Sequence, residues 1–278
     1  MPTAQLTEIM LKKLLILRGL DFSGYRKEIL FRRMGARLEN LGILPENYPD
    51  YFDRNPSETD RLIDALLVNV SFFFRDPLCF ELIGQQILPR IIAEKKKRNS
   101  REIRVWSAGC AGGEEAWSLA ILIAENLRYE PEQWFPFVFA TDISKDTLKT
   151  AAIGRYRRES FERTRVGMLD RYFTLKNDWY EIRPDLRKMV RFSRDDLTSD
   201  QRFAPAESIF GTFDLILCRN VLIYFSTDLQ NKVVRKLCMA LDRGGYLVLG
   251  SAESPGWDTE SGMKAVDRNS RIYRKEEA

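Results

Sequence analysis

The feature that most constrains the fold is a short apolar strand that runs into a glycine-rich turn and then directly into a helix. It occupies residues 103–118, with the sequence IRVWSAGCAGGEEAWS. Glycines in such a turn can adopt positive φ and let the backbone approach a ligand, and the free N–H groups of the first helical turn point at the same place. Because α/β proteins hold nucleotide-like ligands in this way, we expect an α/β fold.

Two glutamates at the start of the helix restrict the ligand. The carboxylates of Glu114 and Glu115 would repel the phosphates of a dinucleotide and attract an ammonium or a sulfonium group. S-adenosylmethionine carries both of these groups. We therefore place Gly109, Glu114 and Glu115 in a predicted cofactor site, although a glycine turn taken alone can also be a tight connection that binds nothing.

Composition excludes several functional classes. The chain has 278 residues, of which 44% are hydrophobic and 30% charged, as in ordinary soluble proteins. Lys and Arg number 44 against 40 Asp and Glu, and a net charge of +4 is too small to indicate nucleic-acid binding. No apolar run approaches the roughly 18 residues of a membrane span, and the N-terminus does not resemble a signal peptide. We expect no membrane insertion, no nucleic-acid partner and a cytoplasmic location.

Histidine is absent from the sequence. This removes the usual general base at neutral pH, the Ser-His and Cys-His nucleophile systems and most transition-metal sites. The cysteines form no C-x-x-C pair and are predicted to be reduced structural thiols, so we expect no metal site. They are Cys79, Cys110, Cys218 and Cys238.

The apolar periodicity changes near residue 100. Residues 1–88 show helical spacing and predict an all-α N-terminal domain, and the charged residues 89–102 predict a linker. Residues 103–278 alternate between strands and helices, which predicts a mostly parallel, doubly wound sheet with helices on both faces. Strands are expected at 104–108, 135–141, 189–193, 213–218 and 245–250, helices at 114–127 and 145–152, and an antiparallel edge strand at 271–274.

Ligands of such a sheet bind at the carboxyl ends of the strands, where the strand order reverses. Asp142 follows the second expected strand and can accept hydrogen bonds from ribose hydroxyls, although it could instead cap the next helix in competition with Ser144. Asp196 follows the third and suits the amino group of an adenine. Tyr224 comes shortly after the fourth, where a core aromatic is the alternative reading. These polar residues should share one edge of the sheet with Arg219 and Asn220.

Five segments carry motifs that go beyond a generic α/β fold. They are NVSFFFR at 69–75, WSAGCAGGEE at 106–115, ATDI at 140–143, CRNVLIYF at 218–225 and GGYLVLG at 244–250. In this order and spacing they closely resemble the CheR family, the bacterial chemoreceptor glutamate methyltransferases. The resemblance implies a Rossmann-like S-adenosylmethionine-dependent methyltransferase fold with an all-α N-terminal domain. It also implies a small inserted β-subdomain near residues 172–192, which looks too short to hold a receptor tail.

The resemblance also implies roles for residues at matching positions. Arg75 and Tyr224 match the pair nearest the transferred methyl group and are the expected catalytic residues. Asp196 and Leu197 match the adenine contacts of the family, which usually has Asn-Leu there, so the aspartate is a departure from the family pattern. The implied cofactor-binding residues are Asn69, Ser71, Arg75, Glu115, Asp142, Asp196, Leu197, Arg219 and Asn220.

The basic helix that contains Arg26, Arg33 and Arg37 is expected to bind the acidic methylation helices of the receptor, although a solvated charged face would look the same. The implied partner is the cytoplasmic domain of a methyl-accepting chemotaxis receptor. The implied products are glutamyl methyl esters and S-adenosylhomocysteine. We expect the enzyme to be a monomer.

Other functions fit parts of the sequence. A methyltransferase that acts on another protein, a small molecule or nucleic acid would share the α/β half, although the loop used on flipped bases is missing. A non-catalytic regulator that binds S-adenosylmethionine could dispense with Arg75 and Tyr224. A dinucleotide dehydrogenase is disfavoured because the turn is not G-x-G-x-x-G.

Overall fold

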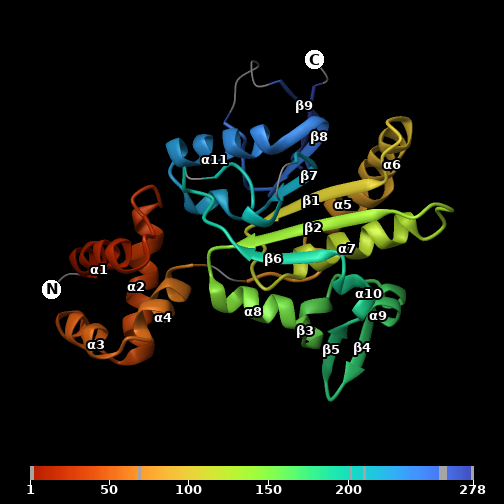
Figure 1. Cartoon of the computed structure of the whole chain (residues 1–278). Coiled ribbons are helices and arrows are strands. Elements are labelled where there is room, and N and C mark those ends of the chain that lie inside the picture. The colour runs from red at the N-terminus through yellow and green to blue at the C-terminus, as the bar shows by residue number, and fades with distance from the viewer. Residues whose placement is uncertain (1–2, 68–69, 201, 209–210, 257–261, 277–278) are drawn as a thin grey trace.

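The structure is a computed structural model that describes residues 3–67, 70–200, 202–208, 211–256 and 262–276. A twisted sheet forms its centre, and the first four helices form a separate group beside that sheet (Figure 1). A small second sheet projects from another side of the molecule.

The first four helices build the N-terminal domain around a core of their own. Apolar residues three or four positions apart in the first helix, such as Met10 and Leu14, are fully buried together with Met34 of the second. This spacing places them on one helical face, which the neighbouring helices cover. The elements are α1 (Thr3–Arg18), α2 (Lys27–Leu41), the 3-10 turn η1 (Pro45–Asn47), α3 (Tyr48–Arg54) and α4 (Glu58–Leu66).

A buried carboxylate joins three elements of this domain. Glu58 is fully buried, and its carboxylate accepts hydrogen bonds from Nε and Nη2 of Arg37 at 2.9 and 2.7 Å. The hydroxyl of Tyr48 donates to Glu58 Oε1 at 2.7 Å. A buried charge is tolerated only when it is paired and hydrogen-bonded. Arg37, predicted to bind substrate, therefore holds the helical domain together in this structure.

The central sheet has seven strands in the order β6-β2-β1-β7-β8-β10-β9. The first five run parallel, and β10 is antiparallel to both of its neighbours, so the predicted mostly parallel sheet is confirmed. The strand expected at the edge, β10, is the second strand from that edge, because β9 pairs with its outer side. The strands are β1 (Glu102–Ala108), β2 (Phe135–Asp142), β6 (Val190–Arg194), β7 (Phe213–Cys218), β8 (Leu241–Leu249), β9 (Met263–Asp267) and β10 (Ile272–Lys275).

The strand order reverses between β1 and β7. From β1 the chain moves outward to β2 and then β6, and it returns to the other side of β1 to form β7 and β8. The loops that follow β1 and β7 therefore leave the same sheet edge in opposite directions and open a crevice between them. This is the point at which the predicted cofactor turn lies.

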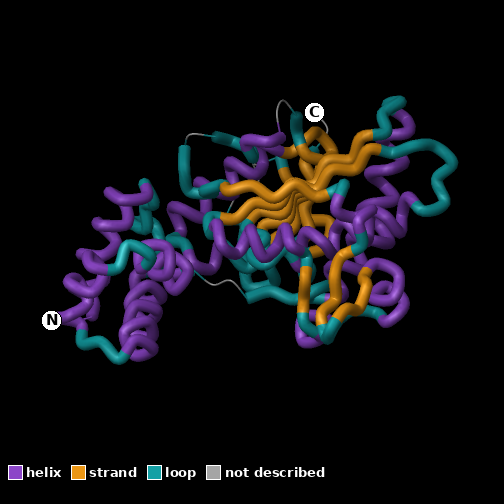
Figure 2. Tube along the Cα trace, turned by 60° about the horizontal axis from the view of Figure 1, so that its bottom comes forward, coloured by secondary structure: helices purple, strands orange, loops and turns teal. Residues whose placement is uncertain are grey.

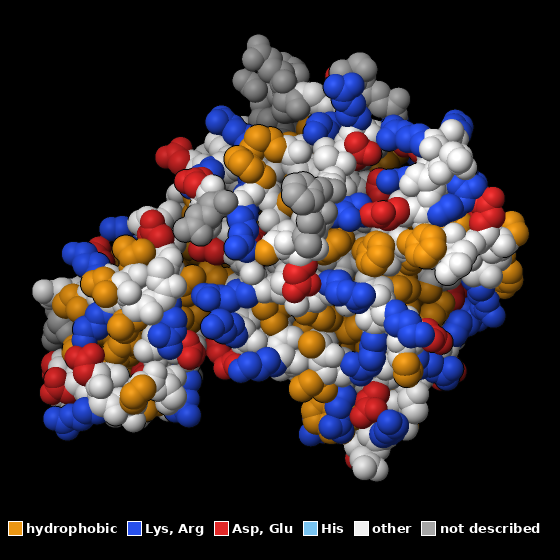
Figure 3. Space-filling view, in the orientation of Figure 1, with side chains coloured by type: hydrophobic (Ala, Val, Ile, Leu, Met, Phe, Trp, Pro, Cys, Tyr) orange, Lys and Arg blue, Asp and Glu red, His pale blue; other side chains and the backbone are white. Residues whose placement is uncertain are grey.

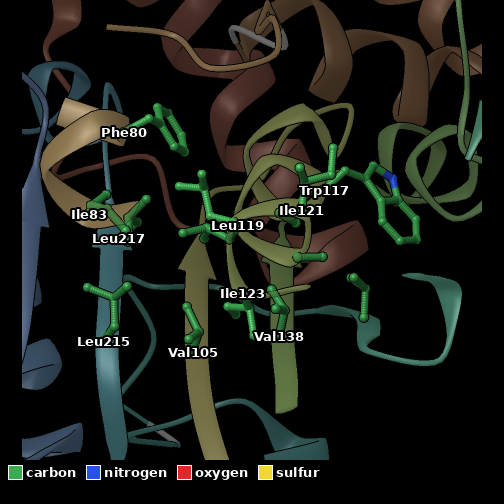
Figure 4. Packing of buried hydrophobic residues seen from close by; sticks show 14 of the residues in the cluster. Phe80, Ile83, Val105, Trp117, Leu119, Ile121, Ile123, Val138, Leu215 and Leu217 are labelled. Atoms are coloured by element: carbon green, nitrogen blue, oxygen red, sulfur yellow. The ribbon is translucent and has the colours of Figure 1, made fainter. Parts of the chain in front are cut away.

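Helices cover both faces of the sheet (Figure 2). Neighbouring residues of β1 point to opposite faces, so Val105 packs with the helices of one face and Trp106 with α11 of the other. Leu119 and Ile123 of α7 lie over Val105 (Figure 4). The helices are α5 (Pro77–Leu82), the π-helical turn η2 (Ile83–Ile87), α6 (Leu88–Lys97), α7 (Glu114–Leu127) and α8 (Lys145–Ile153) on one face, and α11 (Thr227–Ala240) on the other.

The boundary between the two domains lies earlier than the sequence predicts. Residues 89–102 were expected to form a linker, but most of them belong to α6, and Ile91 is buried in the cluster that covers the sheet. Phe80 and Ile83, expected in the helical domain, belong to the same cluster (Figure 4). Helical periodicity identifies an apolar face but does not say which core that face joins.

The inserted β-subdomain is a three-stranded sheet in the order β3-β5-β4. Its turn at Asn177 and Asp178 has positive φ at both residues, which matches the right-handed twist of a two-residue hairpin. The expected limits of 172–192 are partly wrong, because one strand comes from earlier in the chain and residues 190–194 belong to the central sheet. The elements are β3 (Arg155–Tyr156), β4 (Phe173–Lys176), β5 (Trp179–Ile182), α9 (Val166–Tyr172) and α10 (Pro184–Arg187).

Arg37→Ala should lower the free energy of unfolding by about 3 kcal/mol, because it leaves the buried Glu58 carboxylate without its cation. Urea unfolding followed by circular dichroism measures the change. The control is Lys13→Ala, which removes an ion pair to Asp53 whose partners are 31% and 61% exposed, and should cost less than about 1 kcal/mol. Equal losses in the two variants would show that the Glu58 pair is not a structural element.

Candidate functional site

One cleft lies at the carboxyl ends of the parallel strands, between the sheet domain and the helical domain. Its volume is about 980 Å³, including the part open to solvent, which is at the upper end of the range for small-molecule sites. The helical domain contributes the start of α2 and the end of α4. Among the residues that line the cleft are Tyr25, Arg26, Ser71, Arg75, Gly109, Glu115, Asp142, Asp195, Asp196, Leu197, Thr198, Arg219, Asn220, Val221, Tyr224 and Phe225.

The glycine turn after β1 and the loop after β7 touch at the floor of this cleft. Gly109 has φ of +79°, and a Cβ added there would lie 2.4 Å from Cγ2 of Val221. The N–H groups of Gly109 and Cys110 both donate to the carbonyl of Thr141 at the end of β2, at 2.8 and 2.9 Å. Only glycine fits this close approach without strain, so the turn is held against both neighbouring strands.

Glu115 of α7 points into the cleft and is paired beneath it. Ser107 donates to Oε1 at 2.8 Å, and Arg219 donates to Oε2 at 3.3 Å. Burial raises the pKa of the Glu115 carboxyl, and the Arg219 guanidinium opposes this rise. A cationic group in the cleft would meet a carboxylate whose position is already fixed.

Glu114 lies elsewhere, although it is the neighbour of Glu115 in the sequence. Glu114 is buried, with 8% of its surface exposed, and it does not line the cleft. Its Oε2 has no hydrogen-bond partner among the described residues. A Cβ on Gly112 would lie 2.8 Å from that oxygen. Burial raises the pKa of the Glu114 carboxyl. Successive helical residues point about 100° apart, so only one of the two predicted acids reaches the cleft.

Asp142 ends β2 and serves both the turn and the cleft. Its Oδ2 accepts a hydrogen bond from the N–H of Ala111 at 2.9 Å, and its Oδ1 accepts from the N–H of Ser144 at 3.0 Å. Burial raises the pKa of the Asp142 carboxyl, and these N–H groups oppose the rise. The cap of α8 is Ser144, which accepts from the N–H of Thr147, so Asp142 is free of that role.

The loop after β6 forms one wall of the cleft. Asp196 Oδ1 accepts hydrogen bonds from the N–H and the hydroxyl of Thr198 at 2.8 and 2.6 Å, and Leu197 is buried beside it. The sequence did not single out Asp195, whose buried Oδ2 has no hydrogen-bond partner in the described part of the chain. Nζ of Lys236 lies 3.3 to 3.5 Å from three carbonyl oxygens of this loop.

Arg219, at the end of β7, connects the sheet to the segment before α5. Its side chain is only 2% exposed, and it donates to the Asp76 carboxylate and, at 3.1 Å, to the carbonyl of Arg75. The ring of Phe80 lies 5.3 Å from its guanidinium carbon. Arg75 is thereby brought to the rim of the cleft beside Ser71, far in sequence from the glycine turn. Asn69 lies outside the described residues.

The helical domain meets the loop after β7 through backbone hydrogen bonds. The N–H of Arg26 donates to the carbonyl of Tyr224 at 2.9 Å, and the N–H of Ser226 donates to the carbonyl of Gly24 at 2.8 Å. The ring of Tyr25 packs edge-on against Phe225 with centroids 4.9 Å apart. Tyr25 and Phe225 were not predicted as site residues, because no local pattern indicates that these two segments pair.

The predicted substrate-binding arginines, Arg26 just before α2 and Arg33 and Arg37 within it, are engaged within the chain. Arg33 Nη1 donates to the carbonyls of Ala65 and Leu67 at 3.0 and 2.7 Å, and Arg26 Nε donates to the carbonyl of Phe225 at 3.1 Å. Together with the pairing of Arg37 to Glu58, these contacts fix α2 against α4 and the cleft. The described residues contain no cluster suited to a metal ion, and none of their helices is long and apolar enough to span a bilayer.

The lining of the cleft offers groups suited to S-adenosylmethionine. At Gly109 the turn presents backbone without a side chain to the cleft, and the largely buried Glu115 carboxylate can receive an ammonium group. Asp142 lies at the end of the next strand, where a ribose would lie in an open α/β sheet. Asp195, Asp196 and Leu197 line the wall beyond it and could contact an adenine.

Comparisons with known proteins agree with this geometry. The sequence model of a family described as "CheR methyltransferase, SAM binding domain" matches residues 69–269. The chain is 32% identical over 238 residues to the "Chemotaxis protein methyltransferase" of Listeria innocua, covering 84% of both chains. It is 31% identical over 243 residues to the protein of the same name from Escherichia coli, covering 85% of this chain and 79% of that one.

The chain also resembles part of a longer protein. It is 32% identical over 236 residues to an uncharacterized 104.1 kDa protein of Rhodobacter capsulatus. The match covers 84% of this chain and 24% of that protein.

Glu115→Gln should weaken the binding of S-adenosylhomocysteine by about 10- to 100-fold, because a charge-assisted hydrogen bond contributes about 1.5–3 kcal/mol. In the unaltered protein affinity should fall as pH decreases, starting above the ordinary glutamate pKa of about 4.3, because the raised pKa lets Glu115 become protonated earlier. Titration calorimetry between roughly pH 5 and pH 8 measures both effects.

The matched control is Glu114→Gln, one residue away and outside the cleft. It should leave the affinity for S-adenosylhomocysteine close to that of the unaltered protein. If Glu114→Gln weakened binding more than Glu115→Gln did, the assignment of the ammonium site to Glu115 would be wrong.

Proposed function

Because the chain belongs to the CheR methyltransferase family, we propose that it methylates side-chain carboxylates of specific glutamates in the cytoplasmic helices of chemoreceptors. The methyl donor is S-adenosylmethionine. The observation that carries the proposal is one cleft, at the point where the strand order reverses, whose floor holds Glu115 and Asp142 and whose rim holds Arg75 and Tyr224. The acidic floor of the cleft suits the cationic methyl donor, and the rim with Arg75 suits an anionic acceptor.

When bound, S-adenosylmethionine supplies a methyl group activated by the positive sulfur. A glutamate side chain has a pKa of about 4.3 and is already ionised at neutral pH, so it can act as the nucleophile without a general base. Its oxygen forms a bond to the methyl carbon as the carbon–sulfur bond breaks, and S-adenosylhomocysteine is left. This agrees with a chain that contains no histidine.

The protein's own contribution is to position the acceptor. Correct alignment of two reactants can supply roughly 7 to 11 kcal/mol of the barrier reduction. Arg75 is suited to aim the carboxylate, since a guanidinium binds carboxylate oxygens through paired hydrogen bonds. Burial raises the pKa of the Tyr224 hydroxyl, although Arg33 and Arg75 lower it in part. The phenol therefore remains protonated and can donate a hydrogen bond.

Positive charge around the rim favours an acidic partner surface. Arg32 and Arg33 of α2 and Arg75 all act electrostatically on Tyr224. Lys and Arg side chains also gather where the helical domain meets the sheet domain (Figure 3). Because Arg33 and Arg37 are engaged within the chain, we assign the outer contact with acidic receptor helices to Arg32, which is exposed.

The reaction can be tested with methyl-labelled S-adenosylmethionine and a receptor cytoplasmic fragment. Mild base should release the label as volatile methanol, since glutamyl methyl esters hydrolyse and methylated amines do not. Glu115→Gln serves as the control that binds the donor weakly. Base-stable label on the fragment, or transfer to nucleic acid instead, would contradict the proposal.

Arg75→Ala should lower kcat for receptor methylation by about 100-fold, because a misplacement of the acceptor carboxylate by about 1 Å can cost about 100-fold in rate. Affinity for S-adenosylhomocysteine should change little. Arg75→Lys keeps the charge but loses the planar fork, so it should recover only part of the rate. If Arg75→Ala methylated the receptor at the wild-type rate, the assignment of Arg75 to aligning the acceptor carboxylate would be wrong.

Arg32→Glu should raise KM for the receptor fragment by about ten-fold at low ionic strength, with kcat unchanged and the difference reduced by salt. The control is Lys188→Glu. The side chain of Lys188 is 81% exposed. Because Lys188 precedes β6, it lies at the amino ends of the parallel strands, away from the cleft. Identical KM values for the two variants would exclude α2 as the receptor contact.

A further inference from the structure

The loop after β7 carries two groups of the site, and its first residues have an unusual backbone shape. Asn220 lines the cleft and has φ of +60°, an unusual value for a residue other than glycine. Residues Leu222–Tyr224 form a single 3-10 turn, η5, and Tyr224 stands at its end. The first N–H groups of such a turn have no partner within the turn itself. Something outside the loop must satisfy them.

The partner is the carboxylate of Glu253, on the segment that follows β8. Glu253 is 3% exposed, and its Oε2 accepts from the N–H of Asn220 at 3.0 Å. Its Oε1 accepts from the N–H of Val221 at 2.8 Å and of Ile223 at 3.3 Å. Oε2 also accepts from the N–H of Gly250 at 2.6 Å, which anchors the carboxylate to the end of β8. One buried side chain therefore replaces the missing partners of the loop.

Close packing keeps this carboxylate in place. A Cβ added to Gly250 would lie 2.7 Å from Oε2 of Glu253 and 2.8 Å from the backbone nitrogen of Asn220. The absence of a side chain at residue 250 is thus what allows the two segments to meet. The loop also borders the glycine turn, since the side chain of Val221 lies against Gly109.

We propose that Glu253 is a positioning residue for methyl transfer, which through its hydrogen bonds to residues 220, 221 and 223 sets Asn220 against the donor and Tyr224 against the acceptor. The inference rests on the proposed function, because it assigns Tyr224 to the acceptor. Glu253 does not line the cleft, and its hydrogen bonds reach the site through this loop. Its negative charge also acts on Glu115 and Tyr224, which agrees with a place directly behind the site.

Glu253→Gln is the first test. A carboxamide has a single acceptor oxygen and two donor hydrogens, so it cannot accept all four N–H groups and turns a donor towards some of them. Misplacement of reacting groups by about 1 Å can cost about 100-fold in rate. We expect kcat to fall by about 10- to 100-fold, affinity for S-adenosylhomocysteine to fall by less than about 10-fold, and the amides of residues 220–223 to exchange hydrogen faster.

Gly250→Ala is the second test, because it displaces the same carboxylate without removing its charge. It should reproduce the loss of kcat and the faster exchange. The control is Asp214→Asn, at the opposite end of β7. Asp214 is 6% exposed, accepts from the N–H of Arg104 at 2.9 Å and pairs with Lys95 at 2.8 Å. This variant should lower stability with kcat and loop exchange unchanged.

A double-variant cycle with Tyr224→Phe shows whether Glu253 acts through that residue. The effect of Glu253→Gln on kcat should shrink when the tyrosine hydroxyl is already absent. If Glu253→Gln and Gly250→Ala behaved like Asp214→Asn, losing stability alone, the positioning role would be overturned. If the unaltered protein methylated no receptor, the proposed function would fail, while hydrogen exchange and S-adenosylhomocysteine affinity would still decide the role of Glu253.

Discussion

The site depends on one buried guanidinium, that of Arg219. At the end of β7 it reaches Glu115 on α7, the Asp76 carboxylate and the carbonyl of Arg75. A charge with 2% exposure is stable in the interior only because these acceptors surround it, and each of them is held in place by the same requirement. The donor end of the cleft and the segment that carries Arg75 are therefore ordered together, and a change at Arg219 would disturb both.

Burial gives the acids of the cleft their chemical character. Glu115 and Asp142 have raised pKa values because the protein removes most of their water, and hydrogen-bond donors compensate only in part. Such carboxylates bind a cationic or hydroxyl-bearing ligand more strongly than exposed ones would, because the desolvation has already occurred. The reaction itself needs no transfer of a proton from the nucleophile to the protein, because the acceptor carboxylate is already ionised at neutral pH. A fold without histidine can therefore perform it by alignment and by fixed charges.

Much of the fold was predictable from the sequence because the relevant signals are local. The bounds of α7 and β7 agree with the predicted 114–127 and 213–218, since continuous apolar runs and capping residues act over a few positions. The sequence also placed Asp142 and Tyr224 at one end of the sheet, and both line the cleft, because parallel strands carry their carboxyl ends to the same side of a sheet. The domain boundary was misplaced, since the apolar face of α6 is compatible with either core.

The sequence by itself determined the class of fold, the glycine turn and which strand ends carry polar groups, because these follow from hydrophobic period and backbone sterics. Only the tertiary structure decided that Glu115 rather than Glu114 faces the cleft. It likewise decided that Arg37 pairs with the buried Glu58 carboxylate and that the ring of Tyr25 packs against Phe225. It also decided that Glu253 holds the loop after β7. These contacts join residues far apart in the chain, and their partners are chosen by packing and by the need to satisfy buried polar groups.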